Sequence, residues 1–332
     1  VDVRGREVQR ILPRLHEDVN EEWISDKTRF IWDGLRTQRL DKPYVRKGGK
    51  LKEASWDEAF AAIAKAAKDA GKSVAAVSGD MVDCETMYAA RELVTSLGGT
   101  MFEGRQTGLA YDVSSLSAVN FNSTIAGVET ADVILLVGTN LRWEAPLINT
   151  RVRKAIKKGA KVYAIGPQHD LTYKVEWLGN DASLLAKLPK AVVDAFKGAN
   201  RPLMICGGGI LAKDGAHGDA LALAETLGLV KDGWNGFNIL HFAAARMGGL
   251  MLGYATQGGI KAIAAKKPKL LFSLAADEVD YSQFADSFKV FIGHHGDAGA
   301  HAADVILPGA TYAEKAGTYV NLEGRVQRGD KA

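Results

Sequence analysis

The hydrophobic pattern is most regular between residues 124 and 167, where it predicts a strand, a loop, a helix and a second strand. Residues 133–137 form a continuous apolar run, which is typical of a parallel strand buried on both faces. The run ends at Gly138, and Pro146 suits the first turn of a helix. Residues 161–165 begin the next strand. The pattern therefore predicts one right-handed βαβ unit.

The helix of this unit is predicted to be amphipathic, because an apolar residue recurs every four positions. These apolar positions are Ile148, Val152 and Ile156. The basic residues of the 151–158 segment fill the other positions, and we expect them to face water. Sheets of this kind bind ligands at the carboxyl ends of their strands. The candidate ligand edge therefore lies at residues 138–144 and 166–170.

The same patterns continue on both sides of this unit. Ser55 to Glu58 is a capping-box sequence that announces a helix, whereas 40–52 carries turn formers and is expected to be a loop. Other helices are predicted over 84–97, 184–196 and 219–227, and other strands over 1–13, 74–77, 203–206, 269–274, 289–292 and 304–307. The helix after Ser55 should pack through Phe60, Ile63, Ala64 and Ala67. Alternating strands and helices predict an α/β doubly wound fold.

One short segment occurs twice. Residues 131–135 read Ala-Asp-Val-Ile-Leu, and so do residues 303–307. The repeat indicates either two similar α/β lobes or only a common way of entering a buried strand, and both interpretations stay open.

Composition narrows the class of protein. The 332 residues are 47% hydrophobic and 24% charged, as in soluble proteins large enough for two lobes. A net charge of +3 gives no reason to expect binding to nucleic acid, and no apolar run is long enough to enter a membrane. Cys84 and Cys206 lie far apart, which argues against a disulfide framework and for a reducing compartment. Because the chain opens on Val1, we expect it to be a piece of a longer protein.

Two loops carry residues that could bind a ligand. Gly207, Gly208 and Gly209 follow a strand, where a phosphate-binding loop belongs, but they lack the spacing of a dinucleotide fingerprint or a P-loop. A tight turn is the favoured interpretation. His294, His295, Asp297 and His301 could supply zinc or iron ligands. However, adjacent histidines on an extended segment point to opposite faces, which favours ordinary loop histidines.

Two further features are weaker candidates. Asp277, Glu278 and Asp280 follow a strand, but acidic residues there usually mark a solvated helix entry. Cys84 opens a helix, which could lower its pKa. No histidine lies near Cys84 in the sequence, so its nucleophilic role has little support.

Three segments, in order, resemble the molybdopterin oxidoreductase family. Residues 20–30 (NEEWISDKTRF) are similar to N-x-G-W-L-C-x-K-G-R-F. Residues 130–140 (TADVILLVGTN) and 151–155 (RVRKA) are similar to A-D-L-I-L-x-x-G-x-N and R-I-R-K-A. Residues 303–327 carry ADVILP, Glu314, Gly317, Thr318, Asn321, Glu323, Gly324, Arg325 and Gln327 of A-D-V-V-L-P … E-x-x-G-T-x-x-N-x-E-G-R-x-Q. Within this family, the segments are most similar to the large iron–sulfur subunits of respiratory complex I, in their alphaproteobacterial and mitochondrial form.

The resemblance implies two interleaved, Rossmann-like α/β lobes after a small N-terminal β segment. On that basis, residues 1–54 would form a β and loop region, the vestigial cradle of a [4Fe–4S] cluster. Residues 55–120 together with 268–332 would form the first lobe, and residues 121–267 the second.

The chain departs from the family where cofactors are held. Ser25 stands where many relatives place the last cysteine of the cluster, and Lys27 matches a lysine that lies between cluster and pterin in active relatives. Four thiolates normally hold such a cluster, so we expect no catalytic, cofactor-binding or metal-binding residue in this chain. A molybdenum ligand would come from 101–119, where only Asp112, Ser114, Ser115 and Ser117 are chemically suitable.

The resemblance therefore implies a structural domain of the large peripheral-arm subunit of NADH–quinone oxidoreductase. The intact subunit would carry [2Fe–2S] and [4Fe–4S] clusters in its N-terminal part and contact other peripheral-arm subunits. It would lie on the cytoplasmic face of a bacterial inner membrane or the matrix side of the mitochondrial one. The alternatives are an active molybdenum or tungsten oxidoreductase, similar to formate dehydrogenase or nitrate reductase, and a nucleotide-binding module that uses the loops at Gly138 and Gly207.

Overall fold

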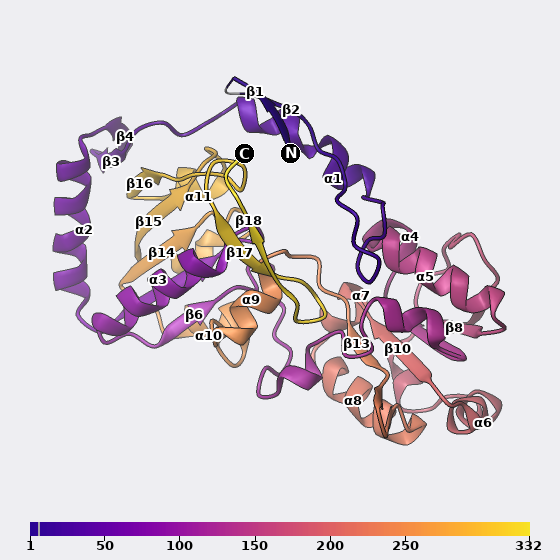
Figure 1. The fold of residues 1–332 in the computed structure, drawn as a ribbon. Coiled ribbons are helices and arrows are strands. Elements are labelled where there is room, and N and C mark those ends of the chain that lie inside the picture. Colours follow the sequence, from indigo (N-terminus) through magenta and orange to yellow (C-terminus); the bar gives the residue numbers. More distant parts are fainter. Residues whose placement is uncertain (6) are drawn as a thin grey trace.

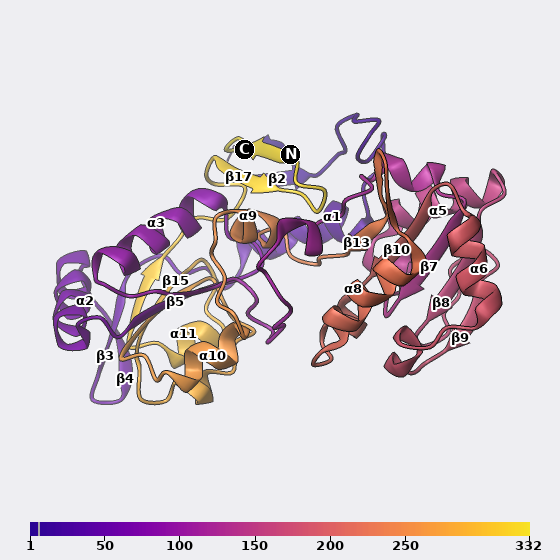
Figure 2. The ribbon, with the colours of Figure 1, turned by 90° about the horizontal axis from the view of Figure 1, so that it is seen from below.

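A computed structural model describes residues 1–5 and 7–332; of the predicted 1–13 strand, only Arg6 lies outside the described residues. Two β-sheets lie in separate lobes, each covered by helices, and the N-terminal segment arches from one lobe to the other (Figure 1). The second view shows the same two lobes, with the C-terminal hairpin between them (Figure 2). The predicted α/β doubly wound architecture is confirmed.

The sheet of the second lobe has five parallel strands. In spatial order they are β13 (Phe237–Ile239), β10 (Pro202–Cys206), β7 (Val133–Val137), β8 (Lys161–Ile165) and β9 (Glu176–Gly179). Alternate residues of β7 pack on opposite faces of the sheet, one face against α6 (Lys190–Gly198) and α8 (Ala216–Leu227), the other against α5 (Pro146–Lys157). The predicted βαβ unit of β7, α5 and β8 is confirmed.

The sheet of the first lobe has seven strands, of which the central ones are parallel. In spatial order they are β4 (Lys50–Glu53), β3 (Tyr44–Lys47), β16 (Val305–Pro308), β15 (Phe288–Gly293), β14 (Leu270–Leu274), β5 (Val74–Ser78) and β6 (Met101–Glu103). The prediction of a loop over 40–52 is wrong, because β3 and β4 form a hairpin paired to β16. Gly48 and Gly49 both have positive φ, at 61° and 76°, as a two-residue hairpin turn requires.

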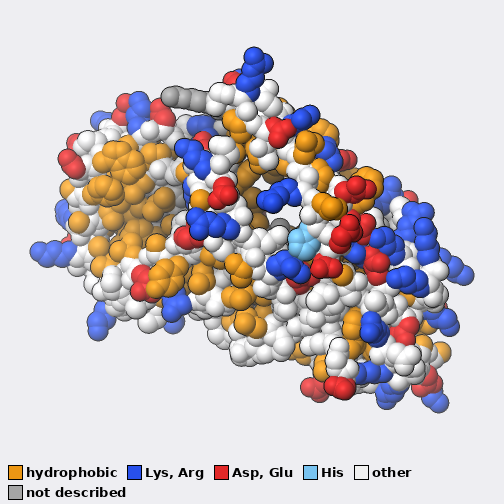
Figure 3. All heavy atoms as spheres, viewed as in Figure 1, with side chains coloured by type: hydrophobic (Ala, Val, Ile, Leu, Met, Phe, Trp, Pro, Cys, Tyr) orange, Lys and Arg blue, Asp and Glu red, His pale blue; other side chains and the backbone are white. Residues whose placement is uncertain are grey.

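Three helix predictions need comment. The capping box is confirmed, because the Ser55 hydroxyl accepts from the Glu58 amide and the Glu58 carboxylate accepts from the Ser55 amide at the start of α2 (Trp56–Ala70). The predicted 184–196 helix begins only at Lys190, after Pro189 and the 3₁₀ turn η4 (Ala182–Leu185). Phe60 is not in the core: it is 51% exposed and packs on Trp56. The molecule shows an apolar surface area over α2 and α3 (Cys84–Ser96) (Figure 3).

The remaining elements are shorter. They are β1 (Asp2–Arg4), β2 (Glu7–Arg10), α1 (Asp26–Phe30), η1 (Ile31–Arg36), η2 (Leu116–Ala118), η3 (Ala126–Thr130), α4 (Leu141–Glu144), α7 (Gly208–Leu211), β11 (Val230–Lys231), β12 (Trp234–Asn235), α9 (Arg246–Met251), α10 (Gly259–Ala265), η5 (Tyr281–Phe284), α11 (Ala298–Ala302), β17 (Gly317–Val320) and β18 (Val326–Gly329). Among the described residues, no helix has the length and apolar character needed to cross a bilayer.

The repeated Ala-Asp-Val-Ile-Leu segments have the same local role in the two sheets. The Asp132 carboxylate, before β7, accepts hydrogen bonds from the Asn200 and Arg201 amides at the entry to β10. The Asp304 carboxylate, before β16, accepts one from the Lys289 amide of β15. In both lobes the aspartate therefore ties its own strand to the parallel neighbour.

The lobe boundaries at 54, 120 and 267 stay predictions. The β3–β4 hairpin belongs to the first sheet, and α9 and α10 contact the first-lobe elements α3, β17 and β6. We therefore propose a second lobe that ends near residue 245, before α9.

The capping box offers a direct test of how α2 is held. Replacing Ser55 by alanine leaves the Glu58 amide without its acceptor, and we expect a loss of about 1 kcal/mol in the free energy of unfolding. Ser96→Ala is the matched control, because Ser96 lies at the C-terminal end of α3 and its hydroxyl only donates to the Leu93 carbonyl. Urea denaturation measures both. Equal losses in the two variants would contradict the capping role of Ser55.

Candidate functional site

The carboxyl edge of the five-stranded sheet carries an open pocket of about 280 Å³. It lies where β7, β8 and β10 end, which is where the sequence places the candidate ligand edge. Its lining residues are Gly138, Thr139, Asn140, Glu144, Ile165, Gly166, Pro167, His169, Asn180, Asp181, Ala182, Gly209, Ile210 and Lys213. The predicted segments 138–144 and 166–170 therefore do meet at one site.

Glycines allow the loops of this pocket to touch through their backbones. A Cβ at Gly138 would lie 2.5 Å from the Ile210 nitrogen, and one at Gly207 would lie 2.6 Å from the Thr139 Cβ. The glycines after β10 therefore serve close packing of two loops, together with the start of the one-turn helix α7. This close packing favours a structural role for Gly207, Gly208 and Gly209 over a role in binding phosphate.

The polar groups of the pocket are only partly paired. The Thr139 hydroxyl donates to the Glu144 carboxylate, which orients both side chains. The Asn140 Oδ1 is buried and has no partner among the described residues. Lys213 supplies a cation at the rim. The pocket therefore offers an amide, a hydroxyl and an ammonium group to a polar ligand.

The histidines of the loop after β15 do not converge on one point. The Nδ1 atoms of His294 and His295 face each other at 2.5 Å, and the His295 Nε2 lies 2.9 Å from the Gly34 carbonyl. His301 is exposed on α11 and contributes only its carbonyl, to Arg46. In the described part of the chain, no three His, Cys, Asp or Glu side chains are placed to hold a metal ion.

The other weak candidates have structural roles. Asp280 caps η5, as expected of a helix entry, while the Asp277 carboxylate accepts from the Gly299 amide. Burial raises the pKa of Asp277. Burial, followed by Glu85 and Asp83, also raises the pKa of Cys84, so the expectation of a lowered thiol pKa is wrong.

Ser25 caps the short helix α1. Its hydroxyl accepts a hydrogen bond from the Thr28 amide at 3.4 Å, and Lys27 is exposed on the same helix. The hydroxyl at the position of a cluster cysteine therefore stabilises local backbone.

The 101–119 region is held by a buried ion pair. Glu103 and Arg105 have fully buried side chains 2.7 Å apart, and Arg105 also donates to the Tyr111 and Thr256 carbonyls. The side chains that could ligate molybdenum follow on an exposed loop: Asp112, Ser114, Ser115 and Ser117. They bond to one another, Ser114 to Asp112 and Ser115 to Ser117.

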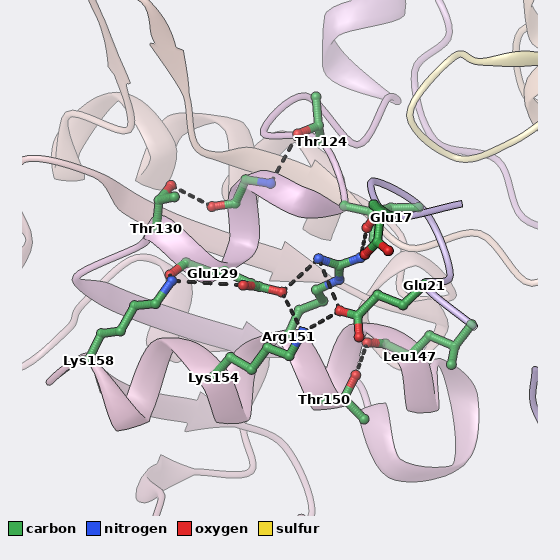
Figure 4. A network of polar contacts seen from close by, with 12 residues as sticks. Glu17, Glu21, Thr124, Glu129, Thr130, Leu147, Thr150, Arg151, Lys154 and Lys158 are labelled. Atoms are coloured by element: carbon green, nitrogen blue, oxygen red, sulfur yellow. Dashed lines mark hydrogen bonds and ion pairs between the residues drawn. The ribbon is translucent and has the colours of Figure 1, made fainter. Parts of the chain in front are cut away.

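The basic face of α5 is not simply solvated, which corrects the sequence interpretation. Arg151 is only 6% exposed and lies 2.6 Å from Glu129 of η3 and 3.3 Å from Glu21 (Figure 4). It also donates to the Glu17 carbonyl, and Lys154 pairs with both Glu21 and Glu129. Burial would raise the pKa of Glu129, but hydrogen bonds from Lys154 and Arg151 hold that pKa below its usual value. The N-terminal segment is thus fastened to the second lobe.

The C-terminal motif also makes structural contacts. The Glu314 carboxylate accepts both Arg39 terminal nitrogens, at 2.8 and 2.7 Å, and this pairing lowers the pKa of Glu314 to about 2. The Glu323 carboxylate accepts from the Ile125 amide at 2.8 Å, which ties the C-terminal hairpin to the second lobe. Sequence patterns alone did not reveal these pairings, since the partners lie 275 and 198 residues apart.

Comparison with known proteins settles the family. The family model for molybdopterin oxidoreductase matches residues 39–332. The chain belongs to the molybdopterin oxidoreductase family. A second model, for the NADH-ubiquinone oxidoreductase NDSU1/NuoG-like 4Fe-4S domain, matches residues 1–33.

Within the molybdopterin oxidoreductase family, similar relatives come from one respiratory complex. The chain is 42% identical over its full length to an NADH-quinone oxidoreductase subunit of Rickettsia felis, covering 50% of that protein. It is 44% identical over 98% of its length to the mitochondrial NADH-ubiquinone oxidoreductase 78 kDa subunit of Neurospora crassa, covering 46% of that protein. The chain spans about half the length of the curated relatives it matches. It is thus homologous to these complex I subunits.

Solved structures support the molybdopterin oxidoreductase fold. Acetylene hydratase from Pelobacter acetylenicus superposes with a TM-score of 0.66 at 15% identity, over 96% of this chain and 62% of that one. A chain of the formyltransferase/hydrolase complex from Methylorubrum extorquens gives a TM-score of 0.62 at 17% identity, over 87% of this chain and 93% of that one.

The residues present do not fit a [4Fe–4S] cluster. Residues 1–33 contain no cysteine, although a 4Fe-4S domain model matches them. The chain's thiols are Cys84, half-buried, and Cys206, buried in the core of the second lobe with its pKa raised to about 12. Two separated thiols cannot replace the four thiolates that hold such a cluster. Nor do Asp112, Ser114, Ser115 and Ser117 fit molybdenum, because their side chains are exposed and bonded to one another in pairs.

Arg151 should be the costliest basic residue of α5 to remove. Arg151→Gln leaves Glu129 and Glu21 with fewer partners in a partly buried site, and we expect a loss of about 3 kcal/mol in the free energy of unfolding. Arg153→Gln is the matched control, since Arg153 lies two residues away and is exposed. Chemical denaturation of both variants measures the difference. Similar losses would show that the network of Figure 4 contributes little.

His294 should make the free energy of unfolding depend on pH. Burial, helped by His295 and Arg39, lowers the pKa of His294 from 6.5 to about 4. The unfolded chain therefore binds a proton that the folded chain does not, and stability falls as pH drops from 6.5 towards 4. His294→Asn should flatten the dependence of the unfolding midpoint on pH in that window, whereas exposed His301→Asn should not. An unchanged slope in His294→Asn would refute the assignment.

Proposed function

We propose that this chain is a supporting, non-catalytic domain of the large peripheral-arm subunit of an NADH–quinone oxidoreductase. The observation that carries the proposal is a 4Fe-4S domain match over residues 1–33 without a single cysteine, in a chain 42% identical over its full length to a bacterial NADH-quinone oxidoreductase subunit. Within the 332 residues the family similarity is present, while a set of four cysteine ligands is not. Fold alone does not imply activity, so the site residues decide the question.

The motif residues support this proposal through what they contact. Arg151 and Lys154 bind the Glu21 carboxylate of the N-terminal segment, Glu314 binds Arg39, and Glu323 binds the Ile125 amide. Each interaction joins segments that are distant in sequence. The residues that carry the resemblance thus hold the fold together, which is the role expected of a support.

In the intact subunit, we place [2Fe–2S] and [4Fe–4S] clusters in an N-terminal part, where they pass electrons from NADH towards quinone. This domain would hold that part in place and contact other subunits of the peripheral arm. Its site would be the cytoplasmic face of a bacterial inner membrane or the matrix side of the mitochondrial one. The names of the relatives support membership of the complex. An active molybdenum or tungsten enzyme is not favoured, because the candidate ligands Asp112, Ser114, Ser115 and Ser117 are exposed and bonded to one another.

Metal analysis tests the absence of catalysis. We expect the 332-residue chain, purified from its native host, to contain less than a tenth of an equivalent, roughly, of molybdenum or tungsten, because no described site offers it a ligand set. Mass spectrometry of the elements measures this. Near-stoichiometric molybdenum or tungsten would overturn the supporting role, and Asp112→Ala would then be the first variant to assay for loss of metal.

A nucleotide-binding role is the second candidate, favoured by the pocket of about 280 Å³ at the strand ends. That volume is near the lower limit of about 300 Å³ for small-molecule sites. Calorimetric titration with GDP should give saturable heat that Lys213→Gln weakens, while exposed Lys157→Gln leaves it unchanged. Absence of saturable heat at millimolar GDP would end this candidate without affecting the supporting role.

A further inference from the structure

The N-terminal segment has almost no core of its own. Among described residues 1–5 and 7–42, Ile11 alone is buried, at 9% exposure. Large apolar side chains there are exposed instead: Val1, Val3, Leu12, Leu15, Trp23, Phe30 and Ile31. A segment that buries so little cannot hold its position through the hydrophobic effect. Its position must depend on polar contacts with the lobes.

The first set of contacts fastens this segment to the second lobe. Glu21 lies 3.3 Å from Arg151 and also pairs with Lys154, both on α5. The Arg151 guanidinium reaches past it to the Glu17 carbonyl (Figure 4). The loop that presents Glu21 is itself bound, since the Asn20 amide donates to the Arg14 carbonyl at 2.8 Å. The side chain of Arg151 is 7% exposed, so water competes poorly for it.

The second set fastens the same segment to the first lobe. Arg39 makes a two-pronged pair with Glu314, which follows β16, and its Nε donates to the His294 carbonyl at 3.2 Å. The Leu40 amide bonds the same carbonyl at 3.0 Å, just beyond the end of β15. His295 lies 2.9 Å from the Gly34 carbonyl. Residues 34–40 therefore lie across the ends of β15 and β16.

The two sets of contacts lie on different lobes, and the segment between them is short. Residues 17–39 pass from α5 of the second lobe to the ends of β15 and β16 in the first, along the arch that Figure 1 shows. A segment fixed at both ends limits how far the lobes can move apart. Loosening either end removes this limit. Other contacts still join the lobes: the Ile125 amide donates to Glu323, the Phe121 amide donates to the Leu322 carbonyl, and Tyr111 and Val119 pack in the core of the second lobe.

We propose that residues 17–39 form an electrostatic clasp that sets the spacing of the two lobes. Arg151 with Lys154 closes one end and Arg39 closes the other. The clasp keeps the segment matched by the 4Fe-4S domain model in one position relative to the sheets. It also makes this segment a structural part of both lobes rather than an appendage. This inference does not depend on the proposed function.

Distance measurements between the lobes test the clasp. Spin labels at Lys65→Cys on α2 and Lys197→Cys on α6 report the spacing in the full chain, with Cys84 and Cys206 replaced by serine; both lysines are exposed. Pulsed EPR should give one narrow distance distribution for the parent. Arg151→Gln and Glu314→Gln should each broaden it. Arg153→Gln and Lys42→Gln are the controls, and both should leave it narrow.

One variant at each end of residues 17–39 allows the clasp to be tested even if one of the two variants does not fold. Circular dichroism establishes that each variant is folded before its distances are compared. If Arg151→Gln fails to fold, Glu314→Gln alone carries the test, because its pair with Arg39 is partly exposed and less costly to lose. A distribution as narrow in a folded Glu314→Gln or Arg151→Gln variant as in the parent would overturn the clasp.

Discussion

Burial of the central parallel strands of both sheets on both faces is the constraint on which the rest of this structure depends. Strands such as β7 and β14 contribute five buried residues each, so their side chains pack in the cores and do not reach solvent or a ligand. Polar chemistry is thereby restricted to the carboxyl ends of the strands and to the loops beyond them. In the second lobe that edge is an open pocket. In the first lobe the ends of β15 and β16 are crossed by residues 34–40.

Charged pairs position the segments that the apolar cores do not fix. The N-terminal segment buries little apolar surface, and its place is decided by Arg39 at one end and Arg151 at the other. Partly buried pairs of this kind contribute little beyond a well-packed apolar contact, but losing one partner is costly. They therefore favour one arrangement of segments over others. Family-motif residues such as Arg151 and Glu314 therefore have a structural role in this chain.

Local patterns in the sequence predicted the parts of the fold that local physics decides. The apolar run of β7 and the capping box at Ser55 each require only a few neighbouring residues, and both were confirmed. The β3–β4 hairpin was missed because Gly48 and Gly49 were interpreted as loop formers, although a glycine pair between two polar strands is a known hairpin signal. The burial of Arg151 could not be predicted, since Glu21, one of its two carboxylate partners, lies 130 residues away along the chain. The pocket was located from the βαβ unit alone, but the burial of the Asn140 Oδ1, which has no partner among the described residues, depends on loops that only the folded chain brings together.

The central claim is that this chain keeps the family's fold without the means to hold its cofactor. Anaerobic reconstitution of the full chain with ferrous iron and sulfide, followed by EPR of the reduced sample, tests it most directly. The account predicts iron that is removed by desalting and no spectrum of a reduced iron–sulfur cluster, because residues 1–33 supply no thiolate. A stoichiometric cluster spectrum that survives desalting would contradict it.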